Sequence, residues 1–245
     1  MAFNAAQYEA TMQKLSSGTQ KLETKLNEIG PKAESTANKW YVPDFLGDAL
    51  IWTANKIIEI GSWILNKIKE FLRGAVAPIR MYNFANDWEG ESVRGAASGV
   101  AGNTAPEALK APKHWKGAGA DAYTGAVKGQ PTAATQIETS ADKIAGALTL
   151  SAAAGLLFYL ALAVILAKFF VALLFAIASV STVVFSWAGA ATIVEEAGVN
   201  TALVIAAVTA LAGALTIQKN QMAVIEGEAH DNSTFPQGKW PTATA

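Results

Sequence analysis

The 245-residue sequence has no cysteine and only two histidines, His114 and His230. Without cysteine the chain has no disulfide bond, no catalytic thiolate and no metal site built on sulfur. His230 stands near Glu226, Glu228 and Asp231, but a solvated polar tail is the better interpretation of one histidine among carboxylates. We therefore expect no metal and no cofactor.

Charge is also scarce. Charged residues make up 16% of the chain, against roughly 25% in soluble domains. The net charge of −1 gives no basic surface for nucleic acid, which is not an expected partner. No glycine-rich phosphate loop and no catalytic grouping of Ser, His and Asp is visible, and Glu195-Glu196 is typical of a loop between apolar runs. We do not expect an enzyme.

Long apolar runs fill the C-terminal third. Between Ile144 and Val194 the one charged residue is Lys168, and a second uncharged run extends from Ala197 to Gln218. About 20 apolar residues cross a membrane, so these runs predict at least two crossings and a location at the cell membrane. The N-terminus lacks a basic region followed by an apolar core, so secretion would use a route other than Sec.

Lys168 allows two arrangements of the apolar runs. A lysine at mid-membrane costs several kcal/mol, which favours a hairpin tip at Lys168 between helices at 145–167 and 169–190. No glycine or proline marks a turn from Leu156 to Trp187, which instead favours one helix to about residue 188, a turn within 188–200 and a last helix at 201–217. Both alternatives stay open, and we expect three apolar helices.

Two amphipathic helices are predicted before residue 78. The first, over 3–30, ends at Gly30-Pro31 and has a heptad stripe of Tyr8, Met12, Leu15, Thr19, Leu22, Leu26 and Ile29. The second, over about 45–77, begins with Asp44 as N-cap, is interrupted at Pro78 and has a wider apolar face of Leu50, Ala54, Ile57, Gly61, Ile64, Ile68 and Phe71.

Both helices are expected to pack in a bundle. The first is alternatively a coiled coil that binds a partner. The second is alternatively a helix on a membrane surface, or the cover of an apolar hairpin, as in haemolytic helical toxins.

The most specific local pattern runs from His114 to Tyr123, after a predicted loop at 102–114. Gly117 supplies backbone conformations that other residues resist, and Asp121 in the first turn of the next helix complements its positive end. Trp115 and Tyr123 fall on the same side. The pattern predicts the corner of a helical hairpin.

This stretch, Trp115-x-Gly117 followed by Ala-x-Ala-Asp-Ala-Tyr, resembles the WXG superfamily of helical hairpin proteins, which are linked to type VII secretion in actinobacteria and firmicutes. The resemblance covers about residues 60–145. It implies a hairpin that dimerises or bundles, is exported or displayed by a type VII-like system, and has no catalytic activity. The family's Tyr-x-x-x-Asp/Glu export signal is not found after the second helix, where Tyr123 is followed by Val127 and Tyr159 by Ala163.

The predicted protein is all-α: a helical hairpin or bundle with a Trp-x-Gly turn, followed by a transmembrane-type apolar hairpin or three-helix unit. Its expected segments are an amphipathic helix and linker at 1–43, the WXG-like hairpin at 44–143, apolar membrane helices at 144–218 and a flexible polar tail at 219–245. The expected partners are membrane lipid and other protein chains, in a homo- or hetero-oligomer through helical faces.

The favoured function is a non-catalytic, membrane-associated WXG-like protein of a type VII-type secretion system, acting by protein interaction and membrane insertion. The alternative is an α-helical pore-forming or membrane-disrupting secreted effector. A third is a scaffold whose apolar tract is an oligomer core.

Overall fold

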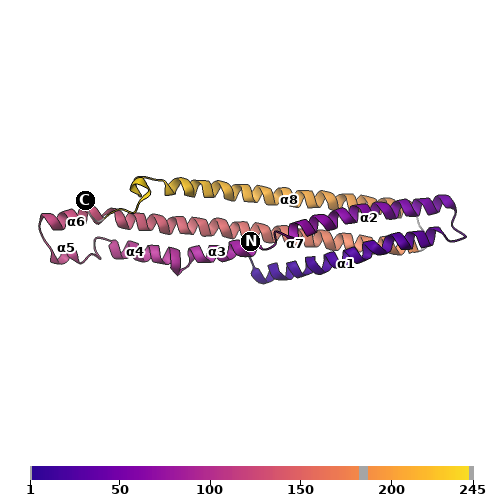
Figure 1. The fold of residues 1–245 in the computed structure, drawn as a ribbon, viewed down its shortest axis with the longest axis horizontal. Coiled ribbons are helices and arrows are strands. Elements are labelled where there is room, and N and C mark those ends of the chain that lie inside the picture. Colours follow the sequence, from indigo (N-terminus) through magenta and orange to yellow (C-terminus); the bar gives the residue numbers. More distant parts are fainter. Residues whose placement is uncertain (1, 182–186, 243–245) are drawn as a thin grey trace. The chain divides into compact units, whose positions relative to one another are not determined.

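The computed structural model describes residues 2–181 and 187–242, and no strand occurs in these ranges (Figure 1). The predicted all-α fold is confirmed. The elements are α1 (Ala5–Ala37), α2 (Asp44–Leu72), α3 (Ala77–Glu89), the π-helical η1 (Glu91–Gly95), α4 (Ala96–Thr104), α5 (Ala111–His114), α6 (Ala118–Val127), α7 (Gly129–Ser181), α8 (Trp187–Ala229) and the 3-10 turn η2 (Pro236–Gly238).

The chain forms two compact units. The bundle unit contains α1, α2 and the parts of α7 and α8 between Ala154 and Gly213. The turn unit contains the residues up to Phe3, the chain from Pro78 to Ala153, and the chain from Ala214 on. The expected segment boundaries at 143/144 and 218/219 lie inside α7 and α8, so the apolar sequence is shared between the two units.

The amphipathic stripes of α1 and α2 are buried in the bundle unit, as predicted for bundle helices. Met12 is half-buried, and the other six residues of the predicted α1 stripe are buried. In α2 the predicted stripe is buried from Leu50 to Ile68, and Phe71 is half-buried. The two helices are antiparallel and pack stripe to stripe, because each has only one apolar side to remove from water.

Three predicted helix boundaries need correction. Pro31 does not end α1, which continues to Ala37 with the proline inside. A proline in a helix interior costs about 3 kcal/mol, and the buried side chains of Ala33 and Thr36 continue the stripe beyond it. Pro43 rather than Asp44 is the N-cap residue of α2, whose last residue is Leu72. The predicted interruption is present but lies at residues 73–76, and Pro78 is in the first turn of α3.

Helix α7 packs against both α1 and α2. The rings of Tyr8 and Tyr159 lie 5.7 Å apart, and those of Phe71 and Phe158 lie 5.1 Å apart. The Tyr159 hydroxyl donates to the Phe71 carbonyl oxygen at 2.8 Å, and the Tyr8 hydroxyl donates to the Ala75 carbonyl oxygen. Burial, and secondly the neighbouring Tyr159, raises the pKa of Tyr8 far above its usual range, so this phenol remains a donor.

Two glycines allow this close packing. A Cβ atom on Gly18 of α1 would lie 2.7 Å from Leu166 Cδ2 of α7. One on Gly61 of α2 would lie 2.5 Å from Leu26 Cδ2 and 3.2 Å from Phe169 Cε1. Gly61 therefore lies where α1, α2 and α7 meet.

We predict that Gly61→Ala lowers the free energy of unfolding by about 1–3 kcal/mol, because the added methyl group overpacks this three-helix contact. The matched control is Gly213→Ala in α8, where a Cβ atom meets nothing within 4 Å. It should raise stability by about 0.5–1 kcal/mol through helix propensity. The measurement is chemical denaturation followed by circular dichroism, and equal effects of the two substitutions would disprove the close packing.

Candidate membrane hairpin and Trp-x-Gly turn

Within the bundle unit, α7 has a wide buried face and a narrow exposed one. The buried side chains include Leu156, Phe158, Tyr159, Leu162, Leu166, Phe169 and Leu173. Four of them, Phe158, Tyr159, Leu166 and Phe169, lie against α1 or α2, the pair of helices that we call the cover. The exposed line has residues three to seven positions apart, namely Leu157, Val164, Lys168, Val171 and Leu174. The cover thus keeps one face of this apolar helix out of water.

Lys168 is not the tip of a hairpin, and this prediction is wrong. The residue lies inside α7, which is continuous from Gly129 to Ser181. Its side chain is exposed between Val164 and Val171. A lysine on the water-facing line of a bundle helix keeps its hydration, so no turn is needed to accommodate it.

Among its described side chains, Glu195 and residues 198–229, α8 buries a much thinner stripe than α7 does. Asn200, Val204 and Ile225 are buried, whereas exposed apolar side chains point in other directions along the helix: Val199, Leu203, Ile205, Leu215, Ile217 and Val224. The Nδ2 atom of Asn200 has no hydrogen-bond partner. Apolar sequence around most of a helix is typical of a helix that contacts lipid or another protein.

The end of the apolar sequence also differs from the predictions. Helix α8 is continuous from Trp187 to Ala229, so the turn expected within 188–200 and the loop expected at Glu195-Glu196 are wrong, as is the expected helix end near residue 217. The first eleven residues of the predicted flexible tail, 219–229, are helical. The connection between α7 and α8 lies outside the described residues.

Two described helical stretches are long and apolar enough to span a membrane: Ala118–Ala178, which includes most of α7, and Gly198–Ala229 of α8. In the most apolar part of the first stretch, 39% of the residues are buried. In the most apolar part of the second stretch, only 11% are buried. The apolar surface of α8 is therefore the less protected by the protein itself.

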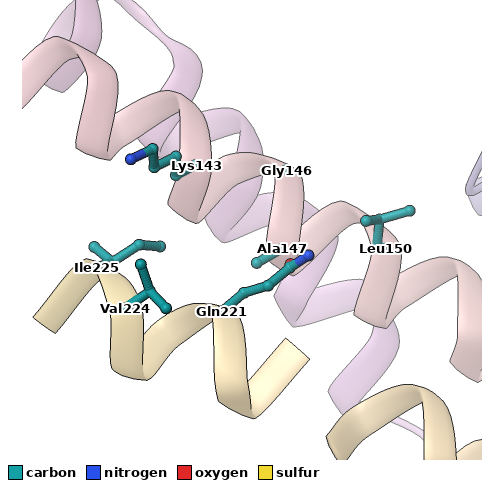
Figure 2. A pocket seen from close by; sticks show the side chains of 7 residues that line it. All are labelled: Lys143, Gly146, Ala147, Leu150, Gln221, Val224 and Ile225. Atoms are coloured by element: carbon teal, nitrogen blue, oxygen red, sulfur yellow. The ribbon is translucent and has the colours of Figure 1, made fainter. Parts of the chain in front are cut away.

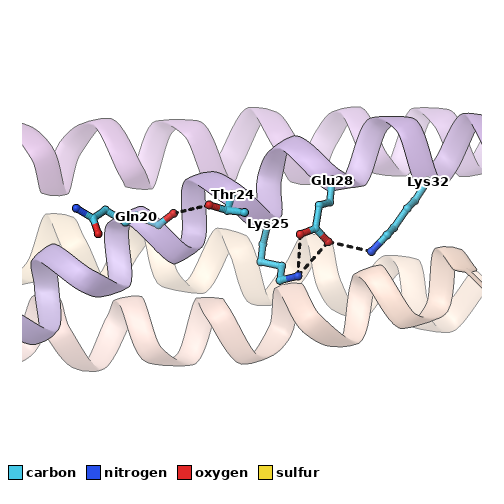
Figure 3. A network of polar contacts seen from close by, with 5 residues as sticks. All are labelled: Gln20, Thr24, Lys25, Glu28 and Lys32. Atoms are coloured by element: carbon cyan, nitrogen blue, oxygen red, sulfur yellow. Dashed lines mark hydrogen bonds and ion pairs between the residues drawn. The ribbon is translucent and has the colours of Figure 1, made fainter.

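Charged side chains lie on the cover outside its buried stripes: Lys69 of α2 pairs with Glu23 of α1 at 2.9 Å, and both side chains are exposed. On α1, Glu28 accepts hydrogen bonds from Lys25 at 2.8 Å and from Lys32 at 2.9 Å, next to a Thr24 hydroxyl bonded to the Gln20 carbonyl (Figure 3). The hydrogen bonds from these two lysines lower the pKa of Glu28, whose side chain is partly exposed. A face carrying such charges belongs in water rather than in hydrocarbon.

In the turn unit, a groove of about 420 Å³ lies between α7 and α8 (Figure 2). Small residues, Gly146 and Ala147, leave this space. Beside it Lys143 Nζ pairs with Glu228 Oε1 at 2.5 Å. The groove is lined by Lys143, Gly146, Ala147, Leu150, Gln221, Val224 and Ile225. No pattern in the sequence had indicated it, because it depends on the pairing of distant segments.

The turn predicted at Trp115-x-Gly117 is present. Gly117 is the N-cap of α6 with φ 103° and ψ −179°, a conformation that only glycine adopts readily. A Cβ atom on Gly119 would lie 2.7 Å from the Trp115 ring, and the rings of Trp115 and Tyr123 lie 6.3 Å apart, on the same side as expected. Asp121 lies in the first turn of α6.

Helices on the two sides of this turn are joined by charge. Arg94 Nε of η1 lies 2.6 Å from Asp142 Oδ1 of α7, and Arg94 Nη2 lies 3.4 Å from Glu138 Oε1. The segment before the turn is broken into α3, η1 and α4, and the four-residue α5 lies inside the predicted loop. The turn is thus the corner of an irregular helical hairpin.

The candidate metal residues have other contacts. His230 Nδ1 lies 2.8 Å from the Glu226 carbonyl oxygen, and Glu228 pairs with Lys143. Across residues 2–181 and 187–242, no group of three or more metal-binding side chains occurs.

No protein-family model, no curated protein and no solved structure matches this chain. The WXG resemblance stays a prediction.

We predict that Gly117→Ala destabilises the turn unit by about 1–3 kcal/mol, since alanine is strained at this φ. Gly125→Ala, in α6, is the matched control, because its Cβ atom meets nothing within 4 Å. The control should be neutral or stabilising by about 0.5–1 kcal/mol. Hydrogen exchange of the α6 amides is the measurement. Unchanged exchange in the Gly117 variant would show that the turn does not depend on glycine.

Proposed function

We propose that this chain is a non-catalytic membrane-inserting protein, in which α7 and α8 form the lipid-entering hairpin and the cover stores it before insertion. The observation that carries the proposal is the packing of the apolar face of α7 against the cover, which carries an exposed charge pair, Lys69–Glu23, outside its buried stripes. This arrangement is expected of a helix that packs against protein in one state and contacts lipid in the other.

A comparison of the hydrophobic free energy of α7 in water and in lipid supports its release from the cover in a membrane. Removing a large apolar side chain from water is worth about 1.5–3 kcal/mol, so exposing α7 to water is strongly unfavourable. Lipid tails are as apolar as the cover, so the same exposure in a membrane loses little hydrophobic free energy. The cover keeps its own stripe-to-stripe contacts, and its exposed charge pair stays in water.

Charge positions fit one crossing by each helix. Lys143 and Lys168 bracket 24 uncharged residues, and Glu196 and Lys219 bracket 22. At 1.5 Å per residue these segments are about 36 and 33 Å long, close to the ~30 Å hydrocarbon thickness. In the inserted state Lys143 and Lys168 would lie at opposite membrane interfaces, where an ammonium group retains water.

A stored hairpin supports the membrane-disrupting effector more than a resident membrane component. A resident helix enters the membrane as it is made, and a water-soluble cover gives it no advantage. Export or display by a type VII-type system, as in the WXG family, is a further part of the proposal. It is supported by the Gly117 turn and by the charge pairs that hold the hairpin around it.

We predict that a disulfide between α1 and α7 blocks insertion. The variant is Gly18→Cys/Leu166→Cys; a Gly18 Cβ atom lies 3.4 Å from Leu166 Cγ, and the native chain has no cysteine to interfere. The oxidised protein should lose carbonate-resistant flotation with liposomes and lose dye release, by at least about tenfold. Reduction should restore both.

The matched control is Gly129→Cys/Pro241→Cys within the turn unit, where the Cβ atoms would lie 3.4 Å apart, close to disulfide geometry. This clamp leaves the cover free, so the oxidised control should insert normally. Equal insertion by the oxidised α1–α7 variant would contradict storage under the cover. A native protein that never binds liposomes would contradict the membrane function itself.

A further inference from the structure

Four large aromatic side chains are exposed where α1 gives way to α2. Trp40 is 95% exposed, Phe45 66%, Trp52 56% and Tyr41 46%. Trp40 and Tyr41 precede α2, and Phe45 and Trp52 belong to its N-terminal part; we call these four residues together the aromatic loop. Its aromatic contacts are local: the rings of Trp40 and Tyr41 lie 5.6 Å apart, and Lys39 Nζ lies 6.0 Å from the Tyr41 ring centre. The packing of the bundle unit does not account for their exposure.

The aromatic loop lies at the end of the bundle unit where α7 ends. Along α1 the contacts to α7 advance together, from Tyr8 with Tyr159 to Gly18 with Leu166. The two helices are therefore parallel. The C-terminus of α1 at Ala37 accordingly lies at the same end as Ser181, the last residue of α7 (Figure 1). A membrane reached by this end meets the aromatic loop and the far end of the apolar hairpin together.

The chemistry of the loop fits a phospholipid surface. Tryptophan and tyrosine combine an apolar ring with one polar atom, and they concentrate at the headgroup level of membranes. The surrounding residues 32–52 contain two lysines and three carboxylates, so attraction to anionic lipid does not explain binding here. Insertion of rings would act on neutral and anionic lipid alike.

We propose that the aromatic loop is the site that first docks this protein on a phospholipid bilayer, by placing the rings of Trp40 and Phe45 at the headgroup boundary. This inference rests on the proposed membrane function and adds to it the site of first contact. Docking would hold the hairpin end of the bundle unit at the membrane while the cover is still in place.

The test compares two double variants of the full chain with equal chemical change. Trp40→Ala/Phe45→Ala removes two rings of the loop. Trp240→Ala/Phe84→Ala removes a tryptophan and a phenylalanine that are 39% and 55% exposed in the turn unit. Partitioning onto phosphatidylcholine vesicles, with and without phosphatidylserine, is measured by flotation. We expect the loop variant to bind at least about tenfold more weakly and the control variant to bind like the native protein.

Two further measurements keep the result interpretable. Circular dichroism should show the same helix content in both variants, because all four side chains are exposed, and Trp40→Tyr should retain binding. Native binding should change by less than about twofold between low and high salt, since ring insertion is not screened as charge is.

Several outcomes would overturn the docking site. Native binding by the loop variant would overturn it and leave the membrane function standing. Binding that needs phosphatidylserine and disappears in salt would assign docking to charge instead. Sedimentation showing that the loop variant loses self-association, with unchanged lipid binding, would assign the loop to a second copy of the chain. Absence of lipid binding by the native protein would overturn both proposals.

Discussion

The structure depends on one mismatch, between the apolar surface of α7 and α8 and the surface that α1 and α2 supply to cover it. The cover buries a wide face of α7 through Gly18 and Gly61. It leaves exposed apolar side chains on the part of α8 that belongs to the bundle unit: Val199, Leu203 and Ile205. Water penalises such surface in proportion to its area, and this exposed apolar surface is the reason for proposing lipid as its partner.

Lys168 illustrates how the same residue fits both states. In the bundle unit it lies on the exposed line of α7, where its ammonium group stays hydrated. In a bilayer it would end an uncharged segment that begins after Lys143 and is about one hydrocarbon thickness long. Under the proposed insertion, a single lysine would mark how far the helix enters lipid, without requiring a break in the helix.

Sequence periodicity predicted the stripes of α1 and α2, because each side chain's burial follows from its position on one amphipathic helix. It did not predict that α1 continues past Pro31, since burial of Ala33 and Thr36 is a tertiary effect. The end of α7 was likewise missed, as an apolar run without glycine or proline carries no local mark of a turn. Gly117 was predicted correctly because its role is local. The groove beside Lys143 was not predicted, because it forms only when distant segments pair. The aromatic loop was not predicted either, because Trp40-Tyr41 falls in the predicted linker, although four aromatic residues lie within residues 40–52.

The central claim is that α7 leaves the cover when the protein enters lipid. The most direct measurement is the distance between spin labels on cysteines introduced at Lys14 of α1 and Val171 of α7, two exposed positions of the bundle unit. The account predicts a short, narrow distance distribution in buffer and a longer one in protein inserted into vesicles. An unchanged distribution in protein that floats with vesicles after carbonate washing would contradict it.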